Sequence, residues 1–208
     1  MTRDQEVLIF QNVTKWHKYQ TVSVQRVNMS VYPGEKVLIC GDGGVRDLFR
    51  MASGLDKPDE GTIYIGKRPA VIPENFPYLK GMKVWDYVQL PMLVRGVKSF
   101  EAEERARTWL EGCGLSDKLS MRAETIAGID KALMLLAAAF ADEPDIVLMA
   151  ETILNLSKKD KETFWNKAET FIHQSGSAFL CFSYRKPAQM FFDRVYEIED
   201  GRLDRRQI

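Results

Sequence analysis

The chain has 208 residues, enough for one generous domain and too few for two of typical size. Its 45% hydrophobic and 11% aromatic content is that of a globular protein, which excludes a disordered or collagen-like chain. Lys and Arg together number 29, as do Asp and Glu, so the formal net charge is zero. Because nucleic-acid binders usually carry a basic excess, this balance argues against that class of protein.

The cysteines give no sign of a disulfide framework or a zinc site, because Cys40, Cys113 and Cys181 are far apart and lack a C-x-x-C spacing. The first residues lack the apolar core of a signal peptide, and the longest apolar run, 132–141, falls well short of the ~20 residues that span a bilayer. We therefore expect a soluble protein of the reducing cytoplasm that reaches a membrane only through a partner.

Two β-type stretches open the chain. The first covers 7–13, and in the second Val27, Met29 and Val31 share one face. Residues 36–40 (KVLIC) form a continuous apolar strand that runs into the turn GDGG and then into a segment with helical spacing. This predicts a strand, a glycine-rich turn and a short helix.

A short strand is expected at 62–65, followed by a proline-punctuated stretch from Pro69 to Pro91. Ser99 is predicted to cap a helix with glutamates in its first turns, where carboxylates complement the helix dipole. A second helix is predicted over 131–141, and a third begins at Ser157.

Two uninterrupted apolar runs, 145–150 and 177–183, require cover on both faces, which is typical of parallel strands. Residues 194–198 give one more strand before the Asp200-Gly201 turn. The sequence thus predicts an α/β fold with a helical insertion.

Several of these segments, in the same order, resemble the nucleotide-binding subunit of ABC transporters. IFQNVTKWH resembles the opening strand and adenine-stacking segment, and SGLDKPDEGTIYIGK is similar to the stretch after the phosphate loop. ADEPDIVLMAE resembles the Walker B strand, and DRVYEIEDGRL the final strand and turn. The sequence pattern LP-x-x-x-RGV most resembles that of the lipoprotein-release, macrolide-export and cell-division cassettes.

The resemblance implies an ABC-type P-loop ATPase fold with an antiparallel β subdomain and an inserted helical subdomain. It implies a single nucleotide-binding domain over 1–208, with a core at 1–76 and 143–208 and a helical insertion at 77–142. ATP, with Mg²⁺ in competent members, is the ligand that this family binds.

The phosphate loop departs from the family pattern G-x-x-x-x-G-K-[ST], in which small residues close on phosphate, Lys binds the β and γ phosphates and a hydroxyl binds Mg²⁺. Aligned without gaps from Gly41, the motif places Arg46 at the second glycine, Asp47 at the Lys and Leu48 at the hydroxyl.

An alignment anchored on Gly54 makes the loop two residues short and places Val45 at the Lys. Neither alignment restores the motif. Two interpretations of the remaining glycines, Gly41, Gly43 and Gly44, stay open. They form a plain strand-to-helix turn, or they leave an anion-tolerant helix N-terminus to which Arg46 contributes.

The Walker B aspartate, the Mg²⁺ ligand of the family, falls at Ala150, and the catalytic glutamate falls at Glu151. Glu151 either retains the role of polarising water or caps the strand end. The signature LSGGQ falls on 126–130, so Ala127 replaces the serine and Gly128 is the one glycine of the pair that stays.

Three further family positions are altered or ambiguous. The glutamine that senses the metal falls at Glu74 and the switch histidine at Tyr184, for which a solvated loop charge and a half-buried aromatic residue are the alternative interpretations. Trp16 and His17 are the two candidates for the adenine-stacking residue.

Every catalytic landmark except Glu151 is changed while the scaffold landmarks persist. This pattern predicts a degenerate, non-hydrolysing subunit with weak ATP binding, peripheral at the inner face of a membrane. It would dock on an integral-membrane permease along Phe76 to Gly96 and pair with a competent ATPase subunit, without binding nucleic acid. The alternatives are a residual ATPase that uses Glu151, and an adaptor unconnected with transport.

Overall fold

The computed structural model describes residues 6–17, 22–41, 43–74, 80–150, 153, 155–185 and 191–206. The chain divides into two compact units. We call them the core unit, residues 1–71, 145–151 and 176–208, and the helical unit, residues 72–144 and 152–175. The predicted limits of the helical insertion, 77–142, remain a prediction. The fold class is α/β with an antiparallel and a largely parallel sheet, as predicted.

The first sheet of the core unit is antiparallel, with strand order β2-β1-β4. Its strands are β1 (Leu8–Trp16), β2 (Val22–Val31) and β4 (Glu60–Ile65). Alternation along β2 buries the face that the sequence predicts, made of Val27, Met29 and Val31.

The second sheet has the order β5-β6-β7-β3-β8-β9. Its strands are β3 (Lys36–Gly41), β5 (Pro69–Ile72), β6 (Ile146–Ala150), β7 (Ala178–Ser183), β8 (Arg194–Glu199) and β9 (Arg202–Arg206). Strands β6, β7, β3 and β8 pair in parallel. All residues of β6 and β7 are buried, as expected for parallel strands covered on both faces.

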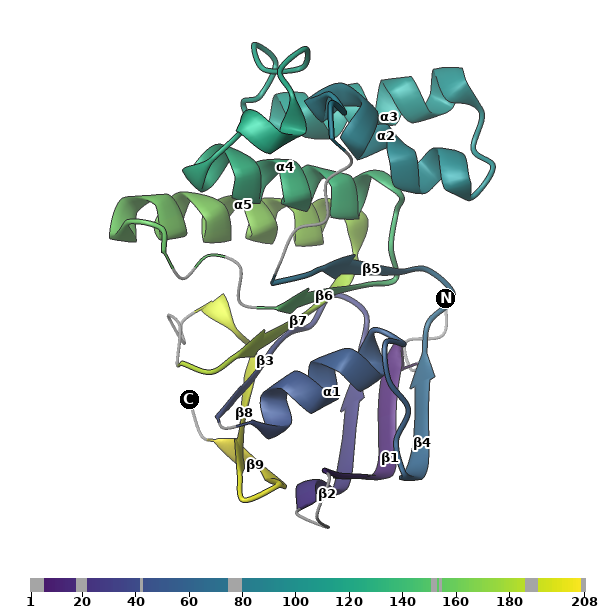
Figure 1. Ribbon diagram of the computed structural model, residues 1–208, viewed down its shortest axis with the longest axis vertical. Helices are drawn as coiled ribbons and strands as arrows, with labels where there is room; N and C mark the ends of the chain where they lie inside the picture. The colour runs from purple at the N-terminus through teal and green to yellow at the C-terminus, as the bar shows by residue number, and fades with distance from the viewer. Residues whose placement is uncertain are drawn as a thin grey trace. The chain divides into compact units, whose positions relative to one another are not determined.

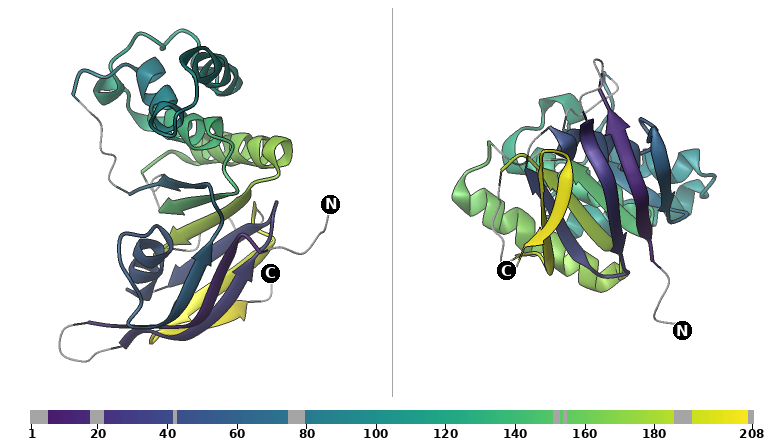
Figure 2. Two further views of the ribbon diagram at one scale, coloured as in Figure 1. Left: turned by 90° about the vertical axis from the view of Figure 1, so that its right-hand side faces the viewer. Right: turned by 90° about the horizontal axis from the view of Figure 1, so that it is seen from below.

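Helix α1 (Gly44–Ala52) follows β3 and packs against strands of both sheets, as Figures 1 and 2 show. The helix ends in a Schellman motif. The N–H of Leu55 donates to the carbonyl of Arg50 at 2.8 Å, and Gly54, at φ +74°, donates to Met51 at 3.1 Å. Glycine is required there because a side chain is disfavoured in the left-handed region.

The helical unit contains α2 (Val84–Val94), α3 (Ser99–Gly112), a 3₁₀ turn (Ala123–Thr125), α4 (Gly128–Ala141) and α5 (Lys158–Ser175). Helix α4 is buried from Ala132 onward because it packs against α2, α3 and α5. An aromatic cluster joins three of these helices: the rings of Trp109 and Phe171 are 4.5 Å apart and those of Phe140 and Phe171 are 5.5 Å apart.

Of the two serines predicted at helix starts, one is confirmed as a cap and the other is not. Ser157 caps α5, since its Oγ accepts a hydrogen bond from the N–H of Asp160 at 3.1 Å and donates to the Asp160 carboxylate at 2.7 Å. Ser99 does not cap α3. The N-cap is Lys98, and the Ser99 hydroxyl donates instead to Glu103, because it already lies inside the first helical turn.

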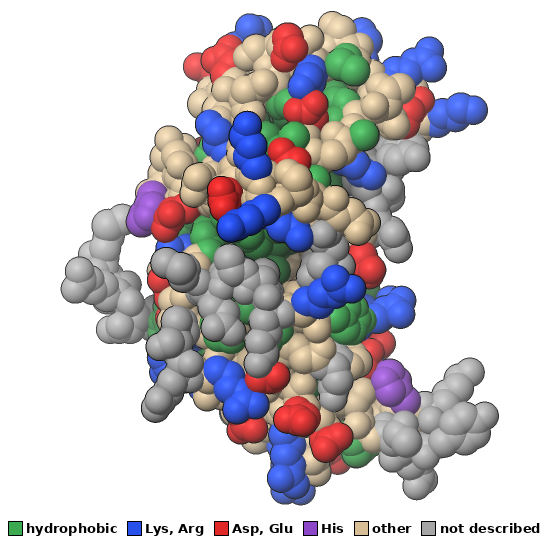
Figure 3. Space-filling model, turned by 90° about the vertical axis from the view of Figure 1, so that its left-hand side faces the viewer, with side chains coloured by type: hydrophobic (Ala, Val, Ile, Leu, Met, Phe, Trp, Pro, Cys, Tyr) green, Lys and Arg blue, Asp and Glu red, His purple; other side chains and the backbone are tan. Residues whose placement is uncertain are grey.

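The surface agrees with the zero net charge. Figure 3 shows acidic and basic side chains interspersed over the face that it presents. Within the described ranges, no helix is both long and apolar enough to cross a membrane.

Candidate functional site

The connection between β3 and α1 holds the altered phosphate loop. Strand β3 ends at Gly41 and α1 begins at Gly44, so only two residues separate them. Of these, Asp42 lies outside the described residues. The family motif places four residues between its two glycines alone. The short connection therefore agrees with the alignment that makes the loop two residues short.

Two of the three glycines are needed for close packing of the backbone. A Cβ built on Gly41 would lie 2.0 Å from the carbonyl oxygen of Ile198 in β8. A Cβ on Gly44 would lie 2.4 Å from the carbonyl oxygen of Ser23 in β2. Gly43, the N-cap of α1, has open space at the same position. These contacts support the turn interpretation for Gly41 and Gly44 and leave Gly43 without a packing role.

The first turn of α1 carries no cation at either candidate lysine position. Val45 is 2% exposed and Asp47 is 8% exposed, while Leu48 is completely buried. Arg46 is exposed on the same turn. A buried carboxylate thus stands one residue from the only basic group of this turn.

The two candidates for adenine stacking lie at the end of β1. Trp16 is 41% exposed, and its backbone N–H donates to the carboxylate of Asp59 at 2.8 Å. The ring of His17 turns toward α1 and places Nε2 at 3.1 Å from Oδ2 of Asp47. The structure therefore brings together a predicted adenine-site residue and a predicted phosphate-loop residue, by direct contact.

The signature segment begins α4. Ala127 is its N-cap and makes no side-chain capping bond, and Gly128 is the first residue, at φ +57°. Asp130, at the signature glutamine, accepts a hydrogen bond from Nζ of Lys118 at 2.6 Å. This bond raises the pKa of Lys118 above its usual value.

A cavity of about 320 Å³ lies within the helical unit beside the signature segment. It brings together two of the predicted site residues, Glu74 and Gly128. The other lining residues are Lys131, Ala132, Leu135, Asn155 and Leu156. Lys131 and Asn155 were missed by sequence reasoning, although Lys131 follows the signature segment directly.

Two other predicted positions are less informative. Ala150 ends β6 and is buried, whereas Glu151 lies outside the described residues. Tyr184, at the switch-histidine position, is 47% exposed just after β7. The described part of the chain holds no group of three or more His, Cys, Asp or Glu side chains that could bind a metal ion.

Comparison with known proteins agrees with the fold and the motif order. The family model described as ABC transporter matches residues 24–153. The lipoprotein-releasing system ATP-binding protein LolD of Saccharophagus degradans is 26% identical over 206 residues, which cover 89% of this chain and 90% of LolD.

Two solved structures share the fold. CbiO1 from Clostridium perfringens, part of the ABC transporter complex CbiONQ, aligns with a TM-score of 0.84 at 16% identity over 97% of this chain and 88% of CbiO1. A dimeric ATP-binding cassette bound to ADP and phosphate aligns with a TM-score of 0.81 at 20% identity, covering 97% of this chain and all of that one. With the family model matching more than half of its length, this chain belongs to the ABC transporter family and has the fold of its ATP-binding cassettes.

Proposed function

We propose that the chain is a degenerate, non-hydrolysing nucleotide-binding subunit of an ABC transporter complex. In this role it is a structural or regulatory partner of a membrane permease and of a competent ATPase subunit. The observation that carries the proposal is the first turn of α1, which has no cation at either candidate lysine position and in which the buried carboxylate of Asp47 is paired with His17.

The Asp47 carboxylate in this turn would repel a triphosphate. An ammonium group about 4 Å from a phosphate oxygen contributes roughly 4 kcal/mol of attraction at an effective dielectric near 20, and a carboxylate turns this into a repulsion of similar size. Asp47 would impose that repulsion, and Val45 would contribute no charge. In both alignments the phosphate group loses its main electrostatic partner.

The surrounding groups do not fit Mg-ATP either. The carbonyl oxygen of Ser23, which carries partial negative charge, lies beside the first residue of α1. Leu48 and Ala150 have no oxygen in their side chains to bind Mg²⁺. The arrangement supports a site that neither orders the metal nor positions a γ-phosphate.

The partnership with a permease is proposed from two observations. LolD is named as the ATP-binding protein of a lipoprotein-releasing system, and CbiO1 as part of a transporter complex. In the proposed docking segment, Phe76 to Gly96, helix α2 ends in two exposed apolar side chains, Leu93 (42%) and Val94 (77%). A partner would bury this apolar surface.

The test is calorimetry and phosphate release on the purified chain. We expect an ATP dissociation constant no better than roughly the millimolar range, about −4 kcal/mol, and no Mg²⁺-dependent turnover. A micromolar dissociation constant, or turnover abolished by Glu151→Gln, would support a residual ATPase. Family membership favours that second candidate, because its relatives are named ATP-binding proteins.

A further test separates a transport subunit from an adaptor unconnected with transport. Affinity purification from the native membrane should recover an integral-membrane permease and a second cassette with an intact phosphate loop. Recovery of soluble proteins alone would contradict the transport role and leave the adaptor function.

A further inference from the structure

The contact between His17 and Asp47 joins the end of β1 to the first turn of α1. Nε2 of His17 lies 3.1 Å from Oδ2 of Asp47, within ion-pair distance. The two residues differ sharply in exposure, since the side chain of His17 is 55% exposed and that of Asp47 is 11% exposed. The imidazole therefore covers a carboxylate that is otherwise enclosed by protein.

Asp47 depends on this contact. Its Oδ2 is buried and makes no hydrogen bond to any residue of the described ranges, and His17 Nε2 lies 3.1 Å from it. A buried carboxylate without a partner is strongly disfavoured. Among the described residues, the imidazole of His17 is the basic group that lies beside it.

Three other basic residues described in this region either pair with other carboxylates or lie exposed. Lys15 lies 3.1 Å from Asp56 and 3.6 Å from Asp59. Arg50 lies 3.9 Å from Asp56. Arg46 is exposed on α1. None of these side chains replaces His17 beside Asp47.

We propose that His17 is an internal ligand of the α1 site: its imidazole is held by Asp47 and closes the degenerate nucleotide site to ATP. The inference rests on the proposed function, which assigns this site no catalytic role. A triphosphate at the start of α1 would have to separate the pair and would then face the uncovered carboxylate.

The first test is a double-mutant cycle in the purified chain, with His17→Ala, Asp47→Asn and the double variant compared by thermal unfolding. We expect His17→Ala to lower the midpoint by about 2–4 °C in the wild-type background and to have little effect when Asp47 is already Asn. His173→Ala and Asp204→Asn, at exposed positions, serve as matched controls. Equal shifts from His17→Ala in both backgrounds would overturn the proposal.

The second test measures binding of a fluorescent ATP analogue to the same variants. Asp47→Asn should bind it about tenfold more tightly than the wild type, because the imidazole loses its anchor and the repulsion is removed. Adding His17→Ala in that background should leave the affinity unchanged. The idea is wrong if Asp47→Asn gives no gain, or if the added His17→Ala weakens binding about tenfold, since His17 would then contact the nucleotide.

These outcomes are distinguishable from failure of the proposed function. ATP hydrolysis by the wild-type chain would refute the non-hydrolysing role whatever the cycle shows. If the double-mutant cycle shows no coupling energy between His17 and Asp47, the role of His17 as an internal ligand is refuted, even if the chain does not hydrolyse ATP.

Discussion

The Cα of Gly41 faces the carbonyl oxygen of Ile198, so that a methyl group on Gly41 would come within 2.0 Å of that oxygen. The two residues are register partners in β3 and β8, and Gly41 has φ +137°, a backbone conformation that side chains rarely adopt. This glycine at the end of β3 is therefore fixed by packing within the chain, independently of any phosphate.

Gly41→Ala should destabilise the protein by roughly 3 kcal/mol or more, because it adds backbone strain to a clash with β8. Gly43→Ala is the matched control: Gly43 has φ −55° and open space around a Cβ, so we expect a change within roughly 0.5 kcal/mol. Urea unfolding of both variants without nucleotide measures the difference. Similar destabilisation by both would contradict the packing role.

The buried strands were the most predictable part of the fold. The apolar runs 36–40 and 145–150 correspond to β3 and β6. A strand that is buried on both faces consists of consecutive hydrophobic residues, and such a run is easy to recognise in a sequence. Helix α2 was not predicted as a separate element, because its segment contains Pro91 and lies in the proline-punctuated stretch. The sequence feature that could have revealed this helix is the four-residue spacing of Val84, Val88 and Met92, which are all buried.

The candidate site was only partly predictable. Residue types could be assigned to motif positions, so that the absence of a lysine at either candidate position, Val45 or Asp47, follows from the sequence alone. The contact of His17 with Asp47 could not be predicted, because it depends on how the chain leaves β1 and how α1 lies against β2 and β4. The exposed position of Trp16 likewise follows from the strand end and not from its residue type.

Restoring a single cation should not restore hydrolysis. Asp47→Lys and Val45→Lys each return a charge but leave the two-residue connection, the missing hydroxyl and Ala150 unchanged, and parts of a site that act together are strongly non-additive. Phosphate release by each variant should equal that of the same variant carrying Glu151→Gln. Release above that background would mean that the site needs only its cation.

Cys113 should resist alkylation in the folded protein. Burial raises the pKa of its thiol to about 12, and Sγ donates to the carbonyl of Leu133 at 3.3 Å. At pH 8 only roughly 10⁻⁴ of the thiol is then ionised, and the thiolate is the form that reacts. Mass spectrometry after iodoacetamide treatment should find Cys113 unmodified in the folded chain and modified in denaturant. Equal labelling rates in both states would contradict the burial effect.

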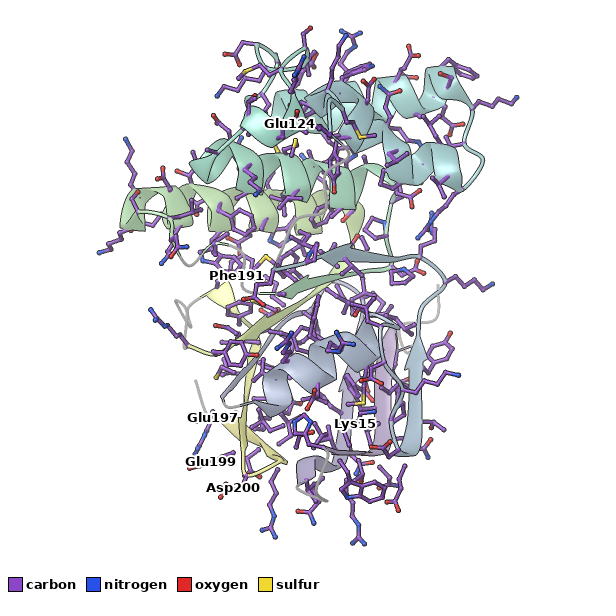
Figure 4. All side chains as sticks on the ribbon, viewed as in Figure 1. Lys15, Glu124, Phe191, Glu197, Glu199 and Asp200 are labelled. Atoms are coloured by element: carbon purple, nitrogen blue, oxygen red, sulfur yellow. The ribbon has the colours of Figure 1, made fainter. Side chains whose placement is uncertain are left out.

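The interaction of Lys15 with Asp56 should make the stability of the protein depend on pH in the acidic range. Lys15 projects from β1 (Figure 4), and its ammonium lies 3.1 Å from Asp56. The backbone N–H of Lys57, at 2.8 Å, and then Lys15 lower the pKa of Asp56 below its usual value of 3.8. When the pKa of a carboxyl group is lower in the folded than in the unfolded protein, ionisation of that group stabilises the fold. This stabilisation is complete above the pKa of the unfolded protein and is lost as the pH falls through the pKa of the folded protein.

Asp56→Asn removes this titration. The difference in unfolding free energy between wild type and Asp56→Asn should be constant above about pH 5 and should shrink from about pH 4 downward. Urea unfolding over a pH series measures it, with the exposed Asp204→Asn as control. A difference that persists unchanged at about pH 3 would mean that Asp56 is not stabilised in its charged form.

Assembly with a competent cassette should depend on the start of α4. Gly128 is exposed, has open space around a Cβ and lies at φ +57° at the start of the helix, where the N–H groups lack intrahelical partners. We therefore expect ATP held by a partner cassette to approach it closely. We expect Gly128→Glu to weaken ATP-driven closure of the complex, because its carboxylate repels the phosphate. Permease recovery should be unchanged, because the proposed docking segment is 76–96.

Gly128→Ala is the matched control, since it carries the same backbone cost at positive φ without the charge. Closure can be followed by ATP-dependent cross-linking between the two cassettes in the purified complex, and docking by the amount of permease recovered with the tagged chain. Closure impaired by Gly128→Glu but not by Gly128→Ala is the expected result. Loss of permease with Gly128→Glu alone would show instead that the face around Gly128 and Glu74 contacts the permease, because the added charge would then act at that interface and not on ATP.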